Sequence, residues 1–393
     1  MNDIIFLNLA NVRDIEKGAI FPSMPDLALV YLGEYLANKG YKVEVFDEHV
    51  DGRIDDNLRL FVRTKFIGIS MYGLNNQENL TRIHGWKKMF PSVKFILGGS
   101  SIGHDITDKP DFIDHMIIGS GYQSLIGIIT ERIKGVVLGN TSSEEDFPAS
   151  FGLTPLKKYN SAALLTSFGC PFSCHFCLSN KLKKFQIRKK ENVFQELDLV
   201  LSSDIKYFEF FDDIFTLCPY MDELLDKVSN KRWGCVVDSR NTNRDTLAKM
   251  IDSGLTTIGF GFESINDNTL QALNKKLTVN DIEWSLKTVK EISCNDLRPH
   301  AFLMYGLPLQ TREDHLRDID KVKSYGFEPQ STHLKVIKGT ELWNKKEEFG
   351  IEIDDNGSVT KTSHMTEEQL NELDQAMNIL NKVSIAKIWR DLL

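Results

Sequence analysis

The stretch AALLTSFGCPFSCHFC (162–177) decides the fold expected for this chain. Its first part, AALLTSF (162–168), is a short apolar run of the kind that forms a strand buried in a parallel sheet. Its second part brings three cysteines, Cys170, Cys174 and Cys177, into one loop directly after that strand. Because three thiolates this close repel one another, the spacing predicts that they share a metal.

The number of ligands indicates which metal this is. A structural zinc ion takes four protein ligands, usually from two paired knuckles. No second pair follows here, and His175 inside the loop is awkwardly placed as a fourth ligand. A [4Fe–4S] cluster held by three cysteines leaves one iron open to a non-protein ligand. The C-x3-C-x2-C spacing therefore favours a reactive iron–sulfur cluster over zinc. The other three cysteines, Cys218, Cys235 and Cys294, are scattered along the chain, and we expect them to be small buried apolar side chains.

Strand-like and helix-like segments alternate after this loop. Further strands are expected at 206–212, 232–238, 257–263, 300–306 and 331–337. A helix is expected at 279–292, where Ile282, Leu286 and Val289 share one face. With 162–168, these six units predict an α/β fold, a partial (β/α)6 barrel with its chemistry at the carboxyl ends of the strands. A closing helix at 364–391 forms most of a short C-terminal region.

The first 140 residues alternate in the same way. Strands are expected at 4–10, 42–47, 65–70, 93–99 and 115–121, and helices at 26–39, 81–90 and 124–135. This order predicts a doubly wound, Rossmann-like parallel sheet, whose ligands bind beyond the carboxyl ends of the strands. The residues at those strand ends are Ser70, Gly98, Gly99, Gly119 and Gly121. Glycine there lets the backbone approach a ligand closely, or it only forms a tight turn. The predicted domains are 1–140, a polar linker 141–159, a core 160–345 and an extension 346–393.

Composition excludes several classes of protein. The 393 residues are 41% hydrophobic and 26% charged, as in ordinary globular proteins. A net charge of −8 does not favour nucleic acid or an anionic membrane as the partner. The chain has neither a run of about 18 apolar residues nor the basic start of a secretory signal. We therefore expect a cytoplasmic protein.

The cysteine motif and the segments after it resemble the radical S-adenosylmethionine (SAM) superfamily over residues 160–345. The resemblance implies a [4Fe–4S] cluster on Cys170, Cys174 and Cys177 whose open iron chelates SAM, and a 5′-deoxyadenosyl radical made by one-electron cleavage. FEFFDDIFT (208–216), GFES (261–264) and YGLP (305–308) resemble further motifs of the superfamily. The implied SAM contacts are Phe176 and Gly306 at the adenine, Asp213 at the amino group, Arg240 at the carboxylate and Glu263 at the ribose. A carboxylate at a strand end can instead only cap the next helix.

Residues 1–140 resemble the cobalamin-binding domain of cobalamin-dependent radical SAM enzymes. The resemblance implies that the strand-end serine and glycines named above contact cobalamin. Relatives often have Gly-Glu-Gly-Glu where this chain has GSGY (119–122). Asp47, His49 and Gly52 satisfy the D-x-H-x-x-G pattern that supplies a cobalt ligand elsewhere, but here they follow the second strand instead of the first. A surface turn is expected there, and the histidine-free segment 11–25 is expected to cover the lower cobalt face.

The resemblance implies an enzyme that methylates an unactivated carbon of a small molecule or peptide. A radical rearrangement, cyclisation or oxidation without methyl transfer is the first alternative. The second alternative is an RNA-modifying or nucleic-acid-binding module. It is suggested by the basic run KLKKFQIRKK (181–190), which could instead be a solvent-exposed loop or helix face. A flavodoxin-type or ferredoxin-type protein is the expected electron donor, and neither a membrane nor nucleic acid is expected as partner.

Overall fold

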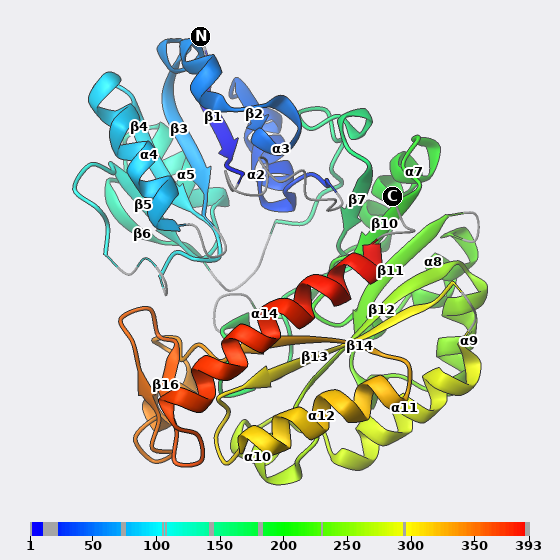
Figure 1. The fold of residues 1–393 in the computed structure, drawn as a ribbon. Helices are drawn as coiled ribbons and strands as arrows, with labels where there is room; N and C mark the ends of the chain where they lie inside the picture. The colour runs from blue at the N-terminus through cyan, green and yellow to red at the C-terminus, as the bar shows by residue number, and fades with distance from the viewer. Residues whose placement is uncertain are drawn as a thin grey trace. The chain divides into compact units, whose positions relative to one another are not determined.

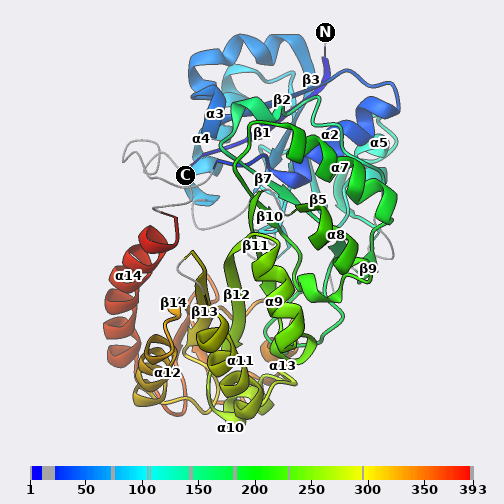
Figure 2. The same cartoon turned by 90° about the vertical axis from the view of Figure 1, so that its right-hand side faces the viewer.

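The computed structural model describes residues 2–10, 23–71, 76–103, 106, 108–140, 145–179, 184–228, 231–293 and 296–389. The chain divides into two compact units, each with its own parallel sheet (Figures 1 and 2). Unit 1 comprises residues 1–164 and 181–205, and unit 2 comprises residues 165–180 and 206–393. The functional domain boundaries given above are drawn on motifs instead of compactness, and they stay a prediction.

Unit 1 contains a six-stranded parallel sheet in the order β2-β1-β3-β4-β5-β6. Strand β2 lies on one side of β1, and strands β3 to β6 follow in order on its other side. The switch point of the sheet therefore lies between β1 and β3. The doubly wound sheet predicted from the sequence is therefore confirmed. Its strands are β1 (Asn2–Asn8), β2 (Val43–Asp47), β3 (Thr64–Ser70), β4 (Lys94–Gly98), β5 (His115–Ile118) and β6 (Gly135–Leu138).

Two helices of unit 1 depart from the predicted segments. Helix α4 (Asn76–Met89) starts five residues before the expected 81–90. The expected helix 124–135 ends early, since α5 (Tyr122–Ile129) stops before Glu131, whose φ is +59°. The chain then enters β6, an edge strand that the sequence did not predict. The other elements are α2 (Leu27–Asn38), α3 (Glu48–Asp51), η1 (Ile54–Arg63), η2 (Leu156–Lys158), β7 (Ser161–Leu164), β9 (Gln186–Ile187) and α7 (Lys190–Ser202).

A buried ion pair explains why residues 181–205 group with unit 1. Arg188 is 1% exposed, and its Nη2 lies 2.8 Å from Oε1 of Glu196 on α7. The same guanidinium donates to the Phe147 carbonyl, and Glu196 Oε1 accepts from the Ala149 amide. These bonds attach α7 to the segment before β7, so the residues after the cysteine loop belong with the first compact unit.

Unit 2 contains parallel strands in the order β14-β13-β12-β11-β10. They are β10 (Tyr207–Phe210), β11 (Arg232–Val237), β12 (Leu255–Glu263), β13 (Arg298–Tyr305) and β14 (Glu328–His333). Strand β14 starts and ends earlier than the predicted 331–337 because the chain leaves the sheet to bridge Lys335 to Ser358. The remaining elements are β8 (Ser167–Phe168), η3 (Phe215–Leu217), α8 (Met221–Val228), η4 (Ser239–Asn241), α9 (Arg244–Asp252), α10 (Asp267–Ala272), α11 (Val279–Ile292), α12 (Arg312–Ser324) and α13 (Glu341–Lys345).

Two predicted segments show how local sequence sets these elements. Helix α11 occupies the predicted 279–292, and the side chain of Thr278 and that of Asp281 form a capping box at its start. The predicted strand 162–168 is wrong as a continuous element, since it breaks into β7 and β8 at 165–166. The buried Asp212 accepts hydrogen bonds from the Thr166 amide and hydroxyl, and this diverts the chain.

The C-terminal region covers the edge of the unit 2 sheet. Helix α14 (Glu367–Trp389), the predicted closing helix, runs alongside β14 (Figure 1). The Asn381 carboxamide accepts from the Ser331 amide at 2.8 Å and donates to the Ser331 carbonyl at 2.6 Å. A side chain thus replaces the missing neighbouring strand and satisfies the backbone of the edge. A short hairpin, β15 (Glu352–Ile353) with β16 (Val359–Lys361), precedes this helix.

Candidate active site

The three cysteines of the motif lie in the loop that follows β8. Each is partly exposed, and each is a free thiol: Cys170, Cys174 and Cys177. His175 fixes this loop on both sides. Its amide donates to the Leu273 carbonyl at 2.8 Å, its Nδ1 bonds the Ala272 carbonyl at 2.9 Å, and its carbonyl accepts from the Leu342 amide at 2.8 Å. His175 therefore positions the loop that carries the thiols.

The surroundings of Cys170 and Cys174 favour the protonated thiol over the thiolate in the absence of a metal. Burial raises the pKa of Cys170 to about 11, and the charge of Asp213 adds to this rise. Burial also raises the pKa of Cys174, against the charge of Lys275, which lowers it. Within the described ranges, no three His, Cys, Asp or Glu side chains already surround a metal position. Binding a metal here would therefore release protons and turn three soft thiolate donors toward it.

Two adjacent carboxylates after β10 have different surroundings. Asp212 is buried and accepts hydrogen bonds from Thr166 and from the Ser167 hydroxyl at 2.6 Å, so it holds the entry to the cysteine loop. Asp213 is exposed, and its charge reaches Cys170. Of these two aspartates, only Asp213 is exposed. Its contact with the amino group of SAM stays a prediction.

Arg240 in η4 faces the cysteine loop. Its Nε and Nη2 donate to the two carboxylate oxygens of Asp238 at 2.8 and 2.7 Å. Its guanidinium lies over the Phe172 ring at 4.0 Å from the centroid, and its charge lowers the pKa of Cys174. Phe172 is therefore an aromatic contact that the sequence reasoning missed, although it stands two residues after Cys170. The predicted adenine neighbour, Phe176, is partly buried in the same loop.

Glu263, at the end of β12, forms an ion pair with Lys275. Glu263 Oε1 lies 2.8 Å from Lys275 Nζ, and the two side chains are only 12% and 9% exposed. The charges of both reach Cys174. Lys275 follows α10, next to the residues that hold the cysteine loop. Sequence reasoning missed this lysine because no spacing rule links it to a glutamate twelve positions earlier.

The backbone at Glu263 is strained. Its φ is +64°, and the Ser264 amide donates to the Phe262 carbonyl at 2.8 Å, which closes a three-residue γ-turn around Glu263. The pairing of β12 with β13 shifts register at the same point. A non-glycine residue in such a conformation costs about 1–3 kcal/mol and persists only where its surroundings impose it. The turn therefore sets where the Glu263 carboxylate lies.

Two glycines of β12, Gly259 and Gly261, leave room for the side chains that lie next to them. A Cβ at Gly261 would lie 3.0 Å from Glu263 Oε1 and 3.2 Å from Lys275 Nζ. A Cβ at Gly259 would lie 2.6 Å from His300 Nε2. One face of β12 therefore carries no side chain at these two positions, and larger residues there would collide with the Glu263–Lys275 pair or with His300.

Gly306 lies where the YGLP turn leaves β13, with a φ of +77°. The residue before it, Tyr305, donates its hydroxyl to Asp374 Oδ1 at 2.5 Å and stacks on His333 with ring centroids 4.8 Å apart. Because a left-handed backbone favours glycine, this turn depends on Gly306 for its conformation. Tyr305 and its partners then fix the turn to the sheet and to α14.

The five residues predicted to contact cobalamin lie at the carboxyl ends of the unit 1 strands. Ser70 ends β3, and Gly98 ends β4. Gly99 has a φ of +104°, and a Cβ there would lie 2.6 Å from the Met71 carbonyl oxygen. Gly119 has a φ of +87°, and Gly121 caps α5. The positions are as predicted, while the glycines at 99 and 119 are also required by the turns themselves.

The D-x-H pattern forms a polar cluster in unit 1. His49 in α3 has its Nδ1 2.8 Å from Asp47 Oδ1 and 3.3 Å from Asn8 Nδ2. Burial lowers the pKa of His49, but the hydrogen bond and charge of Asp47 outweigh burial and raise it. The Tyr159 hydroxyl donates to the other Asp47 oxygen at 3.0 Å. His49 follows β2 as predicted, yet it reaches the end of β1.

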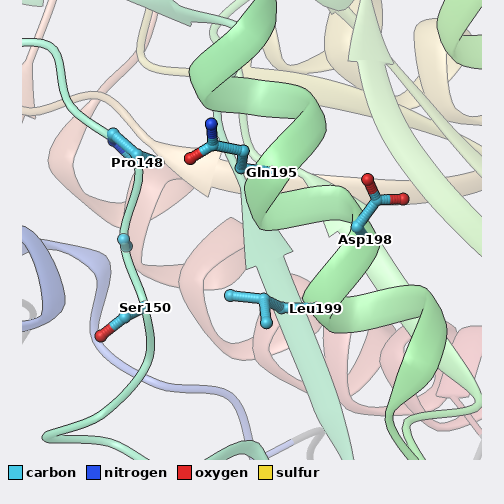
Figure 3. Close-up of a pocket in the computed structure, with 6 residues that line it drawn as sticks. Pro148, Ser150, Gln195, Asp198 and Leu199 are labelled. Atoms are coloured by element: carbon cyan, nitrogen blue, oxygen red, sulfur yellow. The ribbon is translucent and has the colours of Figure 1, made fainter.

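Some predicted segments lie partly or wholly outside the described residues. Residues 11–22, 181–183 and Cys294 lie outside the described residues, so the segments expected to cover cobalt and to carry the basic run are described only in part. In the part of the chain that the structure describes, no helix has the length and apolar character needed to cross a membrane. Figure 3 shows a pocket in unit 1 that contains none of the predicted site residues and is lined by Pro148, Ala149, Ser150, Gln195, Asp198 and Leu199.

Comparison with known proteins places this geometry in context. The sequence family described as the radical SAM superfamily matches residues 164–322. An uncharacterised methyltransferase of Pyrococcus horikoshii is 29% identical, and the alignment covers 94% of this chain and 90% of that protein.

Two solved structures share the fold of the whole chain. The radical SAM methyltransferase TsrM of Kitasatospora setae has a TM-score of 0.73 at 15% identity, over 97% of this chain and 89% of that one. The cobalamin-dependent radical SAM enzyme OxsB has a TM-score of 0.72 at 14% identity, over 96% of this chain and 66% of that one. The chain therefore carries a radical SAM domain and has the fold of TsrM and of the cobalamin-dependent enzyme OxsB.

Proposed function

We propose that this chain is a cobalamin-dependent radical SAM enzyme that methylates an unactivated carbon of a small molecule or short peptide. The observation that carries the proposal is the loop of three thiols next to Asp213, Arg240 and the Glu263–Lys275 pair. The complete doubly wound sheet that precedes this site supports cobalamin as a second cofactor, because TsrM and OxsB, which share the fold, were solved with cobalamin bound.

The residues of unit 2 fit a cluster and SAM in their chemistry. When bound, the cluster and SAM supply the 5′-deoxyadenosyl radical, and cobalamin supplies the methyl group. Cys170, Cys174 and Cys177 would hold three irons of the cluster. Arg240 would bind the carboxylate of SAM, and Asp238 keeps the Arg240 guanidinium in a fixed plane. Asp213, which is exposed beside Cys170, would bind the ammonium group of SAM.

Three further positions would hold the nucleoside part of SAM. Glu263 would accept hydrogen bonds from the ribose hydroxyls, with its carboxylate held by Lys275. The backbone at Gly306 and the ring of Phe176 would flank the adenine. In unit 1, the cobalamin tail would lie against the strand-end residues, which are Ser70, Gly98, Gly99, Gly119 and Gly121.

The partners and location follow from this chemistry. A one-electron donor of the flavodoxin or ferredoxin type would reduce the cluster. The five described cysteines are all free thiols, which fits a reducing compartment such as the cytoplasm.

The ratio of two products tests methyl transfer without knowledge of the substrate. The protein is purified anaerobically, reconstituted with iron, sulfide and cobalamin, and incubated with SAM, a reductant and a cell extract fraction that stimulates turnover. Methyl transfer should yield 5′-deoxyadenosine and S-adenosylhomocysteine in equal amounts, because one SAM makes the radical and another restores methylcobalamin. Substrate consumption with 5′-deoxyadenosine but without S-adenosylhomocysteine would instead indicate a rearrangement, cyclisation or oxidation.

A further inference from the structure

The strained γ-turn at Glu263 needs a restraint from outside its own strand. The turn places a glutamate at a φ of +64°, a region that residues with a Cβ rarely adopt. The hydrogen bond from the Ser264 amide to the Phe262 carbonyl closes the turn, but it is local, and any γ-turn can form it. A conformation of this kind persists only when the surrounding structure over-determines it.

Asp318 of α12 supplies such a restraint. Its side chain is buried, with the residue only 5% exposed. One of its oxygens, Oδ2, accepts from the Ser264 hydroxyl at 2.9 Å and from the Ile265 amide at 2.9 Å. These two donors belong to the two residues that directly follow Glu263. A single carboxylate therefore fixes the chain on the exit side of the strained residue.

Two separate contacts thus act on Glu263. Lys275 pairs with its carboxylate, while Asp318 bonds the backbone and hydroxyl of the residues after it. Burial raises the pKa of Asp318 to about 6, so the fold keeps a carboxyl group there although burial disfavours its charge. A residue that merely filled space between α12 and β12 would not need two acceptor bonds to this turn.

We propose that Asp318 is a positioning residue that holds the Glu263 turn in its binding conformation and so sets the affinity of the site for the ribose of SAM. The inference rests on the proposed function, because it takes Glu263 as the ribose contact. It adds a residue from a helix that carries none of the motifs discussed above.

SAM binding to the anaerobically reconstituted protein tests the inference. Asp318→Ala should weaken binding about tenfold, equivalent to about 1.4 kcal/mol, because the turn can then relax away from the ribose. Asp318→Asn should keep an affinity close to that of the wild type, since its carboxamide oxygen can accept both hydrogen bonds. Hydrogen exchange of the peptide that contains Ile265 should be faster in Asp318→Ala and unchanged in Asp318→Asn.

Asp314→Ala is the matched control on the same helix. Asp314 accepts from the Thr311 amide at 2.9 Å and caps the start of α12, so its loss destabilises the helix without touching the Glu263 turn. This variant should bind SAM like the wild type. Equal weakening in Asp314→Ala and Asp318→Ala would show that Asp318 only stabilises α12, and would overturn the inference.

The outcomes separate this inference from the proposed function. A reconstituted wild type with a full cluster but no affinity for SAM refutes the function, whereas the exchange at Ile265 still reports on Asp318. If Glu263→Gln weakens binding while Asp318→Ala does not, the function stands and the positioning role is refuted. If Asp318→Ala does not fold, Ser264→Ala, which removes one donor to Asp318, takes its place, and wild-type affinity in Ser264→Ala overturns the inference.

Discussion

Replacing Lys275 with methionine should destabilise the protein by leaving a nearly buried carboxylate without its cation. Nζ of Lys275 lies 2.8 Å from Oε1 of Glu263, and the side chains are 9% and 12% exposed. Breaking a buried pair by removing one partner costs about 3–5 kcal/mol. Because about a tenth of each side chain still reaches solvent, we expect the lower end, about 3 kcal/mol.

The measurement is urea unfolding of the metal-free protein at pH 7.5. Burial lowers the pKa of Lys275, but the charge of Glu263 outweighs burial and raises it above 10.5. The stability from this lysine is therefore fully present below pH 10.5 and is lost only as the pH rises through the higher folded value. At pH 7.5 the pair contributes its full effect. Lys276→Met, at the exposed neighbouring position, is the control and should change the free energy of unfolding by less than about 0.5 kcal/mol.

A double variant separates the pair from its two members. Lys275→Met with Glu263→Gln leaves neither charge buried, so it should recover most of the stability that either single variant loses. The reasoning is refuted if Lys275→Met is as stable as Lys276→Met, or if the double variant is no more stable than the single ones. The cycle also matters for binding, since Glu263→Gln alone leaves Lys275 unpaired beside Cys174.

Three further predictions concern the metal, the pH dependence and cobalamin. Alanine at Cys170, Cys174 or Cys177 should abolish the iron–sulfur absorbance, whereas alanine at the buried Cys218 or Cys235 should retain it; a full cluster in Cys174→Ala would contradict the assignment. Burial raises the pKa of Asp318 from 3.8 to about 6, so its contribution to stability falls as pH rises between these values, by about 3 kcal/mol. Asp318→Asn should therefore gain stability relative to the wild type over this window in urea titrations, and a constant difference would contradict the burial argument. His49→Ala should leave the spectrum of bound cobalamin unchanged, because its motif follows β2; a shifted cobalt band would show ligation.

The alternation of strands and helices along the chain and the cysteine loop were predictable from local pattern. A strand buried in a parallel sheet must be apolar on both faces, and IIFLNLA (4–10) shows this directly: Ile4, Ile5, Phe6 and Leu7 are all 3% exposed or less. Where a local pattern competed with a distant contact, prediction failed. The strand 162–168 breaks because Asp212, more than forty residues later, binds Thr166.

The location of the predicted site residues near strand ends could also be predicted from the sequence, because motifs at strand ends come to one edge of a parallel sheet. Their partners were not. Phe172 meets Arg240 and Asp318 meets Ser264 across loops and helices, and neither pair has a signature in spacing.

The sequence by itself determined the class of fold, the three thiols in one loop and the carboxylate at the end of β12, since each depends on residues that are neighbours in the chain. Only the tertiary structure decided what surrounds them: Lys275 against Glu263, Asp238 against Arg240, and a strained turn held by α12. The physical reason is that the charge state and orientation of a buried group depend on the groups packed around it. Those groups come from whichever segments the fold brings together, at separations that no local pattern records.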